Sequence, residues 1–327
     1  MKATSILALP FAIAALLCGG CNNKSSGTPG QLRIAVIPKG TTHIFWKSVE
    51  AGAQKAAKEL NVKVTFIGPQ KEDDRTQQID LVKNQSLQND ALVVAPLDAV
   101  ALRDVVKEVA AKKPVVIIDS SLADSDSFIA SYVATDNREG GRIAARALAE
   151  SLGKKGKVAV LRYAQGSAST EQREEGFLTE IAKYPDIKVE SSEQYAGATA
   201  SQAQDTATNL LTRLTSGDSL TVQGIFASNQ TSTYGMLQAL RGKNQAGKVK
   251  FVGFDCDATF IDALKKGEMQ GSVLQDPVNM GYLGVKNAVA KIKGEKVEPV
   301  VDTGATLITP ANLEDPKISA LIKTQIP

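Results

Sequence analysis

The chain has 327 residues, of which 43% are hydrophobic and 22% are charged, and Lys+Arg 38 against Asp+Glu 35 give a formal net charge of +3. This length allows two domains with separate hydrophobic cores, and the composition is ordinary for a globular protein. Because the charge is nearly balanced and the basic residues are dispersed along the chain, the sequence gives no support to nucleic-acid binding.

Residues 1–21 predict a signal peptide for export. Lys2 precedes a short apolar stretch, residues 6–17, which is shorter than a membrane-spanning helix. The small residues before Cys21 resemble a bacterial lipobox, in which this cysteine is lipidated, although Cys18 stands where a lipobox usually has Leu. Plain secretion with cleavage nearby is the alternative. Residues 22–30 then predict a flexible polar tether.

The first half of the remaining chain alternates between apolar strands and amphipathic helices. Asp73 and Asp74 are expected to open a helix, where carboxylates suit the positive end of the helix dipole. Strands that are apolar throughout predict a parallel sheet that is covered on both faces. The predicted strands are 32–38, 62–67, 91–96 and 114–119, and the predicted helices are 45–60, one that opens at 73–74, and 98–112.

The second half repeats this alternation after a strand at 131–136. The last helix and strand, 280–293 and 297–301, are left over and fit best on the first lobe, so that the chain would cross between lobes more than once. The other predicted elements are helices 137–152, 170–184, 201–214, 231–241 and 258–265, and strands 157–162, 189–195, 224–228, 250–255 and 271–275.

This pattern predicts an α/β fold with two Rossmann-like, doubly wound parallel-sheet lobes joined by a multi-strand hinge. We expect the N-terminal lobe to comprise residues 31–135 and 276–303, and the C-terminal lobe to comprise residues 136–275 and 304–327. Several connecting strands would form a hinge that bends without unfolding either lobe.

Polar residues end several of the apolar strands. Because the carboxyl ends of parallel strands share one edge of a sheet, and ligands sit in the crevice outside that edge, these residues predict a polar cleft for a small molecule. Asp136, together with Asn137, is expected to cap a helix and set the hinge. The strand-end residues are Asp119, Asp136, Asn229, Asp255 and Gln275.

Motifs for nucleotide binding and for catalysis are missing from the sequence. It contains no G-x-G-x-x-G after a strand, no P-loop and no G-x-S-x-G. His43 is the only histidine, so a catalytic triad or a multi-histidine metal site would depend on it alone. Asp73 and Asp74 could serve as catalytic carboxylates, but a helix N-terminus explains them more simply. We therefore expect no cofactor and no metal.

Several stretches resemble, in order and over nearly the whole mature chain, the ribose-binding-protein branch of the type I periplasmic binding proteins. These are solute receptors of sugar ABC transporters, related to the effector domains of LacI-type repressors. The stretches are IAVIPKGTTHIFWKSVEAGAQKAA, APLDAVAL, PVVIIDS, VATDNREGGRIAA, TEQREEGF, IFASNQTSTYGMLQAL, FVGFDCDA and GSVLQDPVNMGYLGV.

The resemblance implies ligand contacts in the first lobe from His43, Phe45, Trp46, Asp119 and Ser120. Aromatic rings suit the apolar C–H face of a sugar, and polar groups suit its hydroxyls. Phe45 and Trp46 could instead belong to the core of the first helical turn, although neighbouring positions cannot both face the core. His43 could be a surface loop residue. Ser120 replaces the Arg of the ribose-binding member, so recognition on that side is expected to differ.

In the second lobe the resemblance implies that Arg173 donates to ligand oxygens. The alternative is a surface ion pair with Glu174 or Glu175. Asp255 is expected to accept from hydroxyls, and its alternative is a helix N-cap, a role for which Asp257 competes. The remaining implied contacts are Tyr195, Asn229 and Gln275.

The resemblance therefore predicts a periplasmic sugar-binding protein that serves a bacterial ABC importer. We expect a monomer, anchored to a membrane only through lipid on Cys21, which binds a monosaccharide or polyol, closes around it and is recognised by a permease. A sensory receptor that presents a sugar or autoinducer-2 to a chemoreceptor or sensor kinase stays open as an alternative. An enzyme in the same cleft would need an acid–base pair that is lacking. A repressor is excluded because a signal peptide stands where a helix-turn-helix would be.

Overall fold

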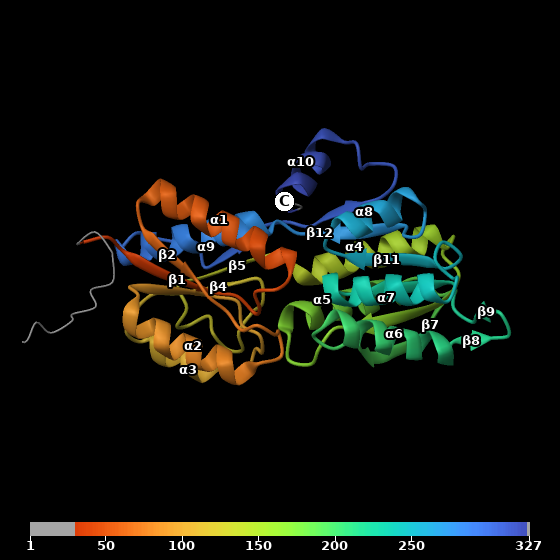
Figure 1. Ribbon diagram of the computed structural model, residues 1–327, viewed down its shortest axis with the longest axis horizontal. Coiled ribbons are helices and arrows are strands. Elements are labelled where there is room, and N and C mark those ends of the chain that lie inside the picture. Colours follow the sequence, from red (N-terminus) through yellow and green to blue (C-terminus); the bar gives the residue numbers. More distant parts are fainter. Residues whose placement is uncertain (1–29, 326–327) are drawn as a thin grey trace, which may run out of the picture. The chain divides into compact units, whose positions relative to one another are not determined.

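Two six-stranded sheets organise residues 30–325, the part of the chain that the computed structural model describes (Figure 1). The strand order is β2-β1-β3-β4-β5-β13 in the first sheet and β7-β6-β10-β11-β12-β14 in the second. Neighbouring strands in both sheets are parallel except β14, which runs antiparallel to β12. Each sheet thus has the doubly wound order with a sixth strand added, which confirms the predicted fold class.

The first sheet and the helices that cover it form the N lobe. Helices α1 and α9 pack on one face of the sheet, and α2 and α3 cover the other (Figure 1). Ile34 and Ile37 point to opposite faces and are both fully buried, as expected for a parallel sheet. The elements are β1 (Arg33–Ile37), α1 (Ile44–Leu60), β2 (Lys63–Phe66), α2 (Arg75–Gln88), β3 (Ala91–Val94), α3 (Arg103–Ala110), β4 (Val115–Ile118), β5 (Ser131–Ala134), α9 (Pro277–Ile292) and β13 (Val300–Asp302).

The second sheet and its helices form the C lobe. Helices α4 and α5 pack on one face, and α6, α7 and α8 cover the other. The elements are α4 (Asn137–Ser151), β6 (Gly156–Arg162), α5 (Ala168–Ile181), β7 (Ile187–Tyr195), α6 (Ala200–Arg213), β10 (Gly224–Ala227), α7 (Gln230–Gly242), β11 (Lys250–Phe254), α8 (Ala258–Lys265), β12 (Gly271–Leu274) and β14 (Thr306–Ile308), with a small hairpin of β8 (Thr215–Ser216) and β9 (Ser219–Leu220).

Between the two sheets the described chain crosses at residues 135–136, 275–276 and 303–305. The final helix, α10 (Pro316–Gln325), packs Ile318 and Leu321 on the C-lobe core. At its end, the Gln325 side chain donates to the backbone oxygen of Gln275 at the second crossing (2.7 Å). The C-terminal helix is thereby attached to the hinge.

Capping side chains explain where the helix boundaries differ from the prediction. The helix expected over 98–112 begins only at Arg103, because the Asp98 carboxylate accepts the backbone N–H groups of Val100 and Ala101 (3.0 and 2.9 Å) and holds this segment in a turn. Asp74, in contrast, caps α2 as its position suggested, since it accepts the backbone N–H of Gln77 (2.9 Å).

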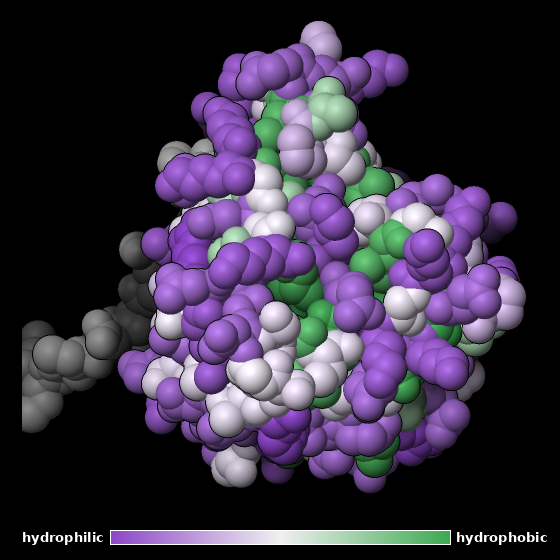
Figure 2. Space-filling model, turned by 90° about the vertical axis from the view of Figure 1, so that its right-hand side faces the viewer, coloured by the Kyte–Doolittle hydropathy of each residue, from purple (hydrophilic) through white to green (hydrophobic). Residues whose placement is uncertain are grey.

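The surface facing the viewer in Figure 2 is mostly hydrophilic, with hydrophobic residues in small separate patches. No helix within residues 30–325 is long and apolar enough to cross a membrane. The predicted signal peptide with Cys21 and most of the predicted tether, residues 22–29, lie outside the described residues, as do residues 326–327.

Candidate ligand-binding site

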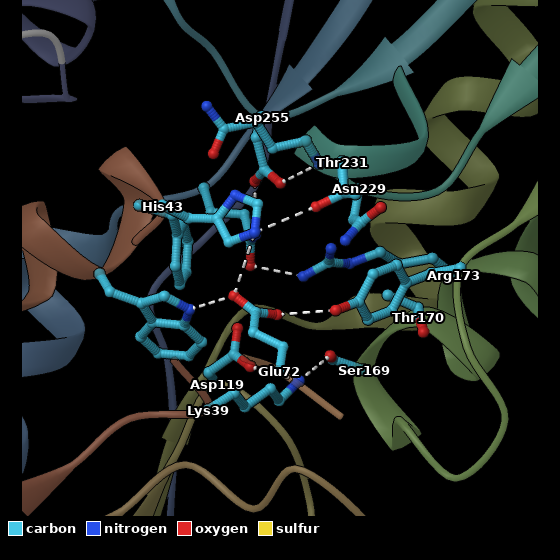
Figure 3. A pocket seen from close by; sticks show the side chains of 15 residues that line it. Lys39, His43, Glu72, Asp119, Ser169, Thr170, Arg173, Asn229, Thr231 and Asp255 are labelled. Atoms are coloured by element: carbon cyan, nitrogen blue, oxygen red, sulfur yellow. Dashed lines mark hydrogen bonds and ion pairs between the residues drawn. The ribbon is translucent and has the colours of Figure 1, made fainter. Parts of the chain in front are cut away.

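A pocket lies between the two lobes, at the carboxyl ends of strands from both sheets (Figure 3). Its cavity volume is about 40 Å³. The N lobe contributes residues that follow β1, β2 and β4, and the C lobe and hinge contribute residues that follow β6, β10, β11 and β12. The lining consists of Lys39, His43, Phe45, Trp46, Glu72, Asp119, Tyr163, Ser169, Thr170, Arg173, Asn229, Gln230, Thr231, Asp255 and Gln275.

Most of the residues singled out in the sequence meet in this pocket, but two do not. Ser120 is fully buried beneath it, where its hydroxyl accepts the backbone N–H of Ser169 across the lobe boundary (3.1 Å). Tyr195 ends β7, the edge strand of the C-lobe sheet, and lines a neighbouring cavity instead. Its ring lies 5.7 Å from the Arg162 guanidinium. Neither side chain lines this pocket, and their contact with a ligand stays a prediction.

Phe45 and Trp46 begin α1 and meet edge to face, with ring centroids 4.9 Å apart. Trp46 is only 3% exposed and packs on the N-lobe core, yet it also lines the pocket. Its indole N–H donates to Glu72 Oε1 (2.6 Å). Phe45 also packs against this core and lines the pocket, so both interpretations of the aromatic pair hold for both residues.

Arg173 is fixed by partners in the C lobe and at the hinge. Its guanidinium donates to Asn137 Oδ1 (2.8 Å), the backbone oxygen of Ser228 (3.2 Å) and Gln275 Oε1 (2.8 Å). The guanidinium carbon also lies 4.0 Å from the centroid of the Phe254 ring. Burial lowers the pKa of Arg173, and Asp255 and Asp119 oppose that effect.

The surface ion pair considered for Arg173 does not form. Glu175 pairs with Arg138 instead, and Glu174 lies 3.4 Å from Arg162. Close packing of α4 on α5 brings Arg173 into the site, because a Cβ on Gly141 would lie 1.9 Å from the Arg173 backbone oxygen. A larger residue at position 141 would push this segment of α5 out of place.

Asp255 is buried in the same network, with its backbone at φ +67°. It accepts from Gln275 Nε2 (2.7 Å) and from the backbone N–H of Gln230 (2.9 Å). Burial raises the pKa of Asp255, and Arg173 acts in the opposite direction. Asp257 provides the N-cap of α8, so the helix-cap alternative for Asp255 is wrong.

Asn229 has a capping role that the sequence interpretation did not include. Its side-chain oxygen accepts from the backbone N–H (3.0 Å) and the hydroxyl (2.8 Å) of Ser232, which closes the N-terminus of α7. Because the cap fixes the carboxamide, Asn229 is held rigidly where it borders the pocket.

Lys39 is the most informative residue that sequence reasoning missed. Its ammonium group lies 2.9 Å from Asp119 Oδ2, and both side chains are 5% exposed. It also donates to Ser169 Oγ (2.9 Å) and Ser167 Oγ (3.3 Å) in the C lobe. The structure thus supplies a cation beside Asp119 from the loop after β1. A lysine directly after a buried strand was the available signal.

Glu72 and Tyr163 were also missed, and they meet across the lobe boundary. The Tyr163 hydroxyl donates to Glu72 Oε2 (2.8 Å), and His43 Nε2 lies 3.7 Å from Glu72 Oε1. His43 also lies 3.4 Å from the Thr231 hydroxyl of the C lobe. Three lobe-to-lobe contacts at the pocket, from Lys39, His43 and Glu72, therefore originate in N-lobe loops.

The pocket offers many hydrogen-bonding groups and little that suggests a metal. Its lining includes three carboxyl groups (Asp119, Asp255 and Glu72) and two basic side chains (Lys39 and Arg173). Within residues 30–325 no group of three or more His, Cys, Asp or Glu side chains could hold a metal ion. Oriented acceptors and donors beside aromatic rings suit a small polar ligand with an apolar face.

A family model described as a periplasmic binding protein domain matches residues 34–296. The chain belongs to the periplasmic binding protein family. Within that family it is 31% identical to the ribose import binding protein of Haemophilus influenzae over 288 residues, which is 87% of this chain and 94% of the relative. This confirms the predicted resemblance to the ribose-binding branch.

Solved structures of other periplasmic binding proteins agree. A carbohydrate transporter solute-binding protein from Agrobacterium radiobacter, in complex with D-arabinose, is 40% identical with a TM-score of 0.85, covering 90% of this chain and 100% of that one. An ABC transporter solute-binding protein from Agrobacterium vitis, bound with α-D-tagatopyranose, is 32% identical with a TM-score of 0.83, covering 89% of this chain and 99% of that one.

Proposed function

We propose that this periplasmic binding protein binds a neutral monosaccharide or polyol between its lobes and delivers it to the permease of a bacterial ABC importer. The observation that carries the proposal is the pocket itself, where strand-end and loop residues of both lobes bring carboxylates, amides, a guanidinium and aromatic rings together. The relatives are named for ribose import or hold D-arabinose or tagatose, which are all small neutral sugars.

The proposed contacts divide by chemistry. Phe45 and Trp46 would pack on the C–H face of the ring, and Asp119 with Lys39 would bind hydroxyls from the N-lobe side. Charge-assisted hydrogen bonds are the strongest available to a hydroxyl, which favours ionised partners in such a site. The remaining proposed ligand contacts are His43, Arg173, Asn229, Asp255 and Gln275.

Hinge motion follows from the size of the pocket. A cavity of about 40 Å³ is far below the ~300 Å³ or more of ordinary ligand pockets, so a sugar enters only when the lobes move apart. The chain segments at 135–136, 275–276 and 303–305 would bend, and the ligand would then draw both lobes together. The permease would recognise this closed form.

The ligand would leave chemically unchanged. Asp119 is paired with Lys39, and Asp255 accepts hydrogen bonds from Gln275 and Gln230, which suits these two carboxyl groups to holding a ligand. No cofactor is part of the proposal. We further propose a monomer at the cell envelope, held by lipid on Cys21, with residues 22–30 as the tether.

Thermal unfolding of the protein, first stripped of co-purified ligand, tests this proposal. The panel would contain D-ribose, D-arabinose, D-tagatose, D-allose, D-fucose, xylitol and myo-inositol. A ligand at a hundred times its dissociation constant adds about 2.7 kcal/mol of stability, a readily visible rise in melting temperature. One or two strong responses are expected. A flat response from folded protein to every member would contradict sugar binding.

A further inference from the structure

A second cavity adjoins the ligand pocket on the side away from the hinge. Its volume is about 360 Å³, compared with about 40 Å³ for the pocket. Arg75 in the N lobe and Tyr195 and Gln202 in the C lobe are among its lining residues. It lies beside β2 in the first sheet and β7 in the second. Both are edge strands, and each is far from the strand after which the chain crosses between lobes, β5 in the first sheet and β12 in the second. We call it the outer cavity.

Lys39, Glu72 and Tyr163 line both the pocket and the outer cavity, and they form the wall between them. Each residue of this wall is held from the opposite lobe. Glu72 accepts from Tyr163 in the C lobe, and Lys39 donates to Ser169 in the C lobe (2.9 Å). The wall is therefore complete only when the lobes are closed.

Glu72 is the rigid centre of the wall. Its two carboxylate oxygens each accept one short hydrogen bond, from the Trp46 indole N–H (2.6 Å) and from the Tyr163 hydroxyl (2.8 Å). Tyr163 is 2% exposed, and burial together with Glu72 raises its pKa well above the usual range, so that its hydroxyl stays a donor. A group anchored on two sides does not move aside at low cost.

We propose that the wall of Lys39, Glu72 and Tyr163 limits the size of the ligand. It admits an unsubstituted monosaccharide or polyol and rejects the same molecule when a substituent points toward the outer cavity. This inference rests on the proposed function and adds a specificity-determining role for Glu72. Removing the Glu72 side chain would join the pocket to the outer cavity, where a substituent finds room.

The test compares ligands that differ by one methyl group. Titration calorimetry on the full protein would measure the dissociation constants of D-ribose, D-arabinose, D-allose and D-fucose, and of the methyl glycosides and mono-O-methyl ethers of whichever binds. One methyl group changes selectivity by roughly 10- to 200-fold where a pocket rejects it. We expect the unmodified protein to discriminate within that range against the derivative whose methyl group faces Glu72.

In Glu72→Ala this discrimination is expected to fall by about tenfold for one derivative and to stay unchanged for the others. Glu72→Gln keeps the bulk of the wall and should retain the discrimination. Asp73→Ala is the matched control, because this neighbouring carboxylate lines only the outer cavity. Tyr163→Phe removes the hydrogen bond across the lobes but keeps the ring, and it is the second variant should Glu72→Ala not fold. Its discrimination against the same derivative is expected to fall by less than in Glu72→Ala.

Each outcome decides a different claim. If the unmodified protein bound the parent sugars and all their O-methyl derivatives equally, the proposal that the wall limits ligand size would be overturned, while the proposed function would stay intact. Unchanged discrimination in both Glu72→Ala and Tyr163→Phe would have the same consequence. Binding of no sugar from the panel would overturn the proposed function and this inference together. Relaxed discrimination in Glu72→Ala but not in Glu72→Gln or Asp73→Ala would support the wall.

Discussion

The two halves of the pocket are built in different ways. In the C-lobe half, Arg173 and Asp255 reach partners in the C lobe or at the hinge. In the N-lobe half, Lys39, His43 and Glu72 come from loops and make contacts with the C lobe. The C-lobe half is therefore preorganised whether the lobes are open or closed, whereas the N-lobe half is completed by closure.

This difference predicts how variants divide between stability and binding. Substitutions in the C-lobe half should lower both the stability of the fold and the affinity for ligand, because the hydrogen bonds of Arg173 and Asp255 exist in the free protein as well. Changes in the N-lobe half should act mainly on ligand affinity, because its lobe-to-lobe contacts form only in the closed state.

The largest effect is expected from Arg173→Ala. Removing the guanidinium leaves Asp255 and the oxygens of Asn137 and Gln275 without a buried cation, so ligand affinity should fall by about 2–5 kcal/mol and the melting temperature should fall too. Calorimetric titration and thermal unfolding measure the two effects. Arg138→Ala removes a half-exposed arginine of α4 and is the control. Wild-type affinity in Arg173→Ala would contradict the site assignment.

Lys39→Met should cost less, about 1–2 kcal/mol in ligand affinity, because water can solvate Asp119 when the lobes are apart. The melting temperature without ligand should change less than in Arg173→Ala. Lys71→Met, on the exposed part of the following N-lobe loop, is the control. If Lys39→Met lowered stability as much as Arg173→Ala, the N-lobe half would be as preorganised as the C-lobe half.

The stability of the C lobe should also respond to pH through Glu174, which does not line the pocket but accepts from Ser228 and the backbone of Tyr163 next to it. Burial raises the pKa of Glu174 to about 7, opposed by hydrogen bonds from Ser228 and the backbone of Tyr163. A carboxyl whose pKa is higher in the folded protein stabilises the fold while protonated. Its contribution to stability is therefore full below the ordinary glutamate pKa of 4.5 and is lost as the pH rises through the folded-state pKa of about 7.

Glu174→Gln should consequently flatten the decline of melting temperature between pH 5 and pH 7, a slope worth at most about 1.4 kcal/mol per pH unit. Glu175→Gln, a neighbouring residue paired with Arg138, should leave the decline unchanged. Burial also raises the pKa of Asp255, so some decline of melting temperature with rising pH should remain in Glu174→Gln. An identical pH profile in Glu174→Gln and the unmodified protein would contradict this role for Glu174.

Tyr195→Ala should have the smallest effect. Because the ring lies in the outer cavity and not in the pocket, affinity for a monosaccharide should stay within about twofold, or ~0.4 kcal/mol, of the unmodified protein. A tenfold loss in the same titration would return Tyr195 to the ligand site and contradict the division between the two cavities.

The features that could be predicted from the sequence are those that depend on the local pattern of apolar and polar residues. Apolar strands with polar ends predicted the parallel sheets. They also placed Asp119 at the carboxyl edge of the N-lobe sheet and Asn229, Asp255 and Gln275 at the carboxyl edge of the C-lobe sheet, because that placement follows from strand direction alone. Tyr195 lies outside the pocket because its strand is at the edge of the sheet, a property that depends on which strands pair. The turn at Asp98 was missed because a side-chain hydrogen bond replaced a helical turn.

Glu72 and Tyr163 could not be assigned to the site from pattern, and the only signal for Lys39 was its position after a buried strand. Lys39 and Glu72 lie in loops after different strands, and Tyr163 comes from the other lobe. Their contacts arise only when the two lobes meet, at sequence separations that no periodicity reports. Helix and strand signals describe the lobes separately, whereas closure decides which loops face one another.

Tryptophan fluorescence tests the central claim most directly, because Trp46 is the only tryptophan in the sequence and lines the pocket. Ligand-free protein would be titrated with the sugar that most raises the melting temperature. A saturable change in emission, with a midpoint that matches the calorimetric dissociation constant, is the result we predict. A sugar that stabilises the protein and leaves Trp46 emission unchanged throughout the titration would bind elsewhere and contradict the account.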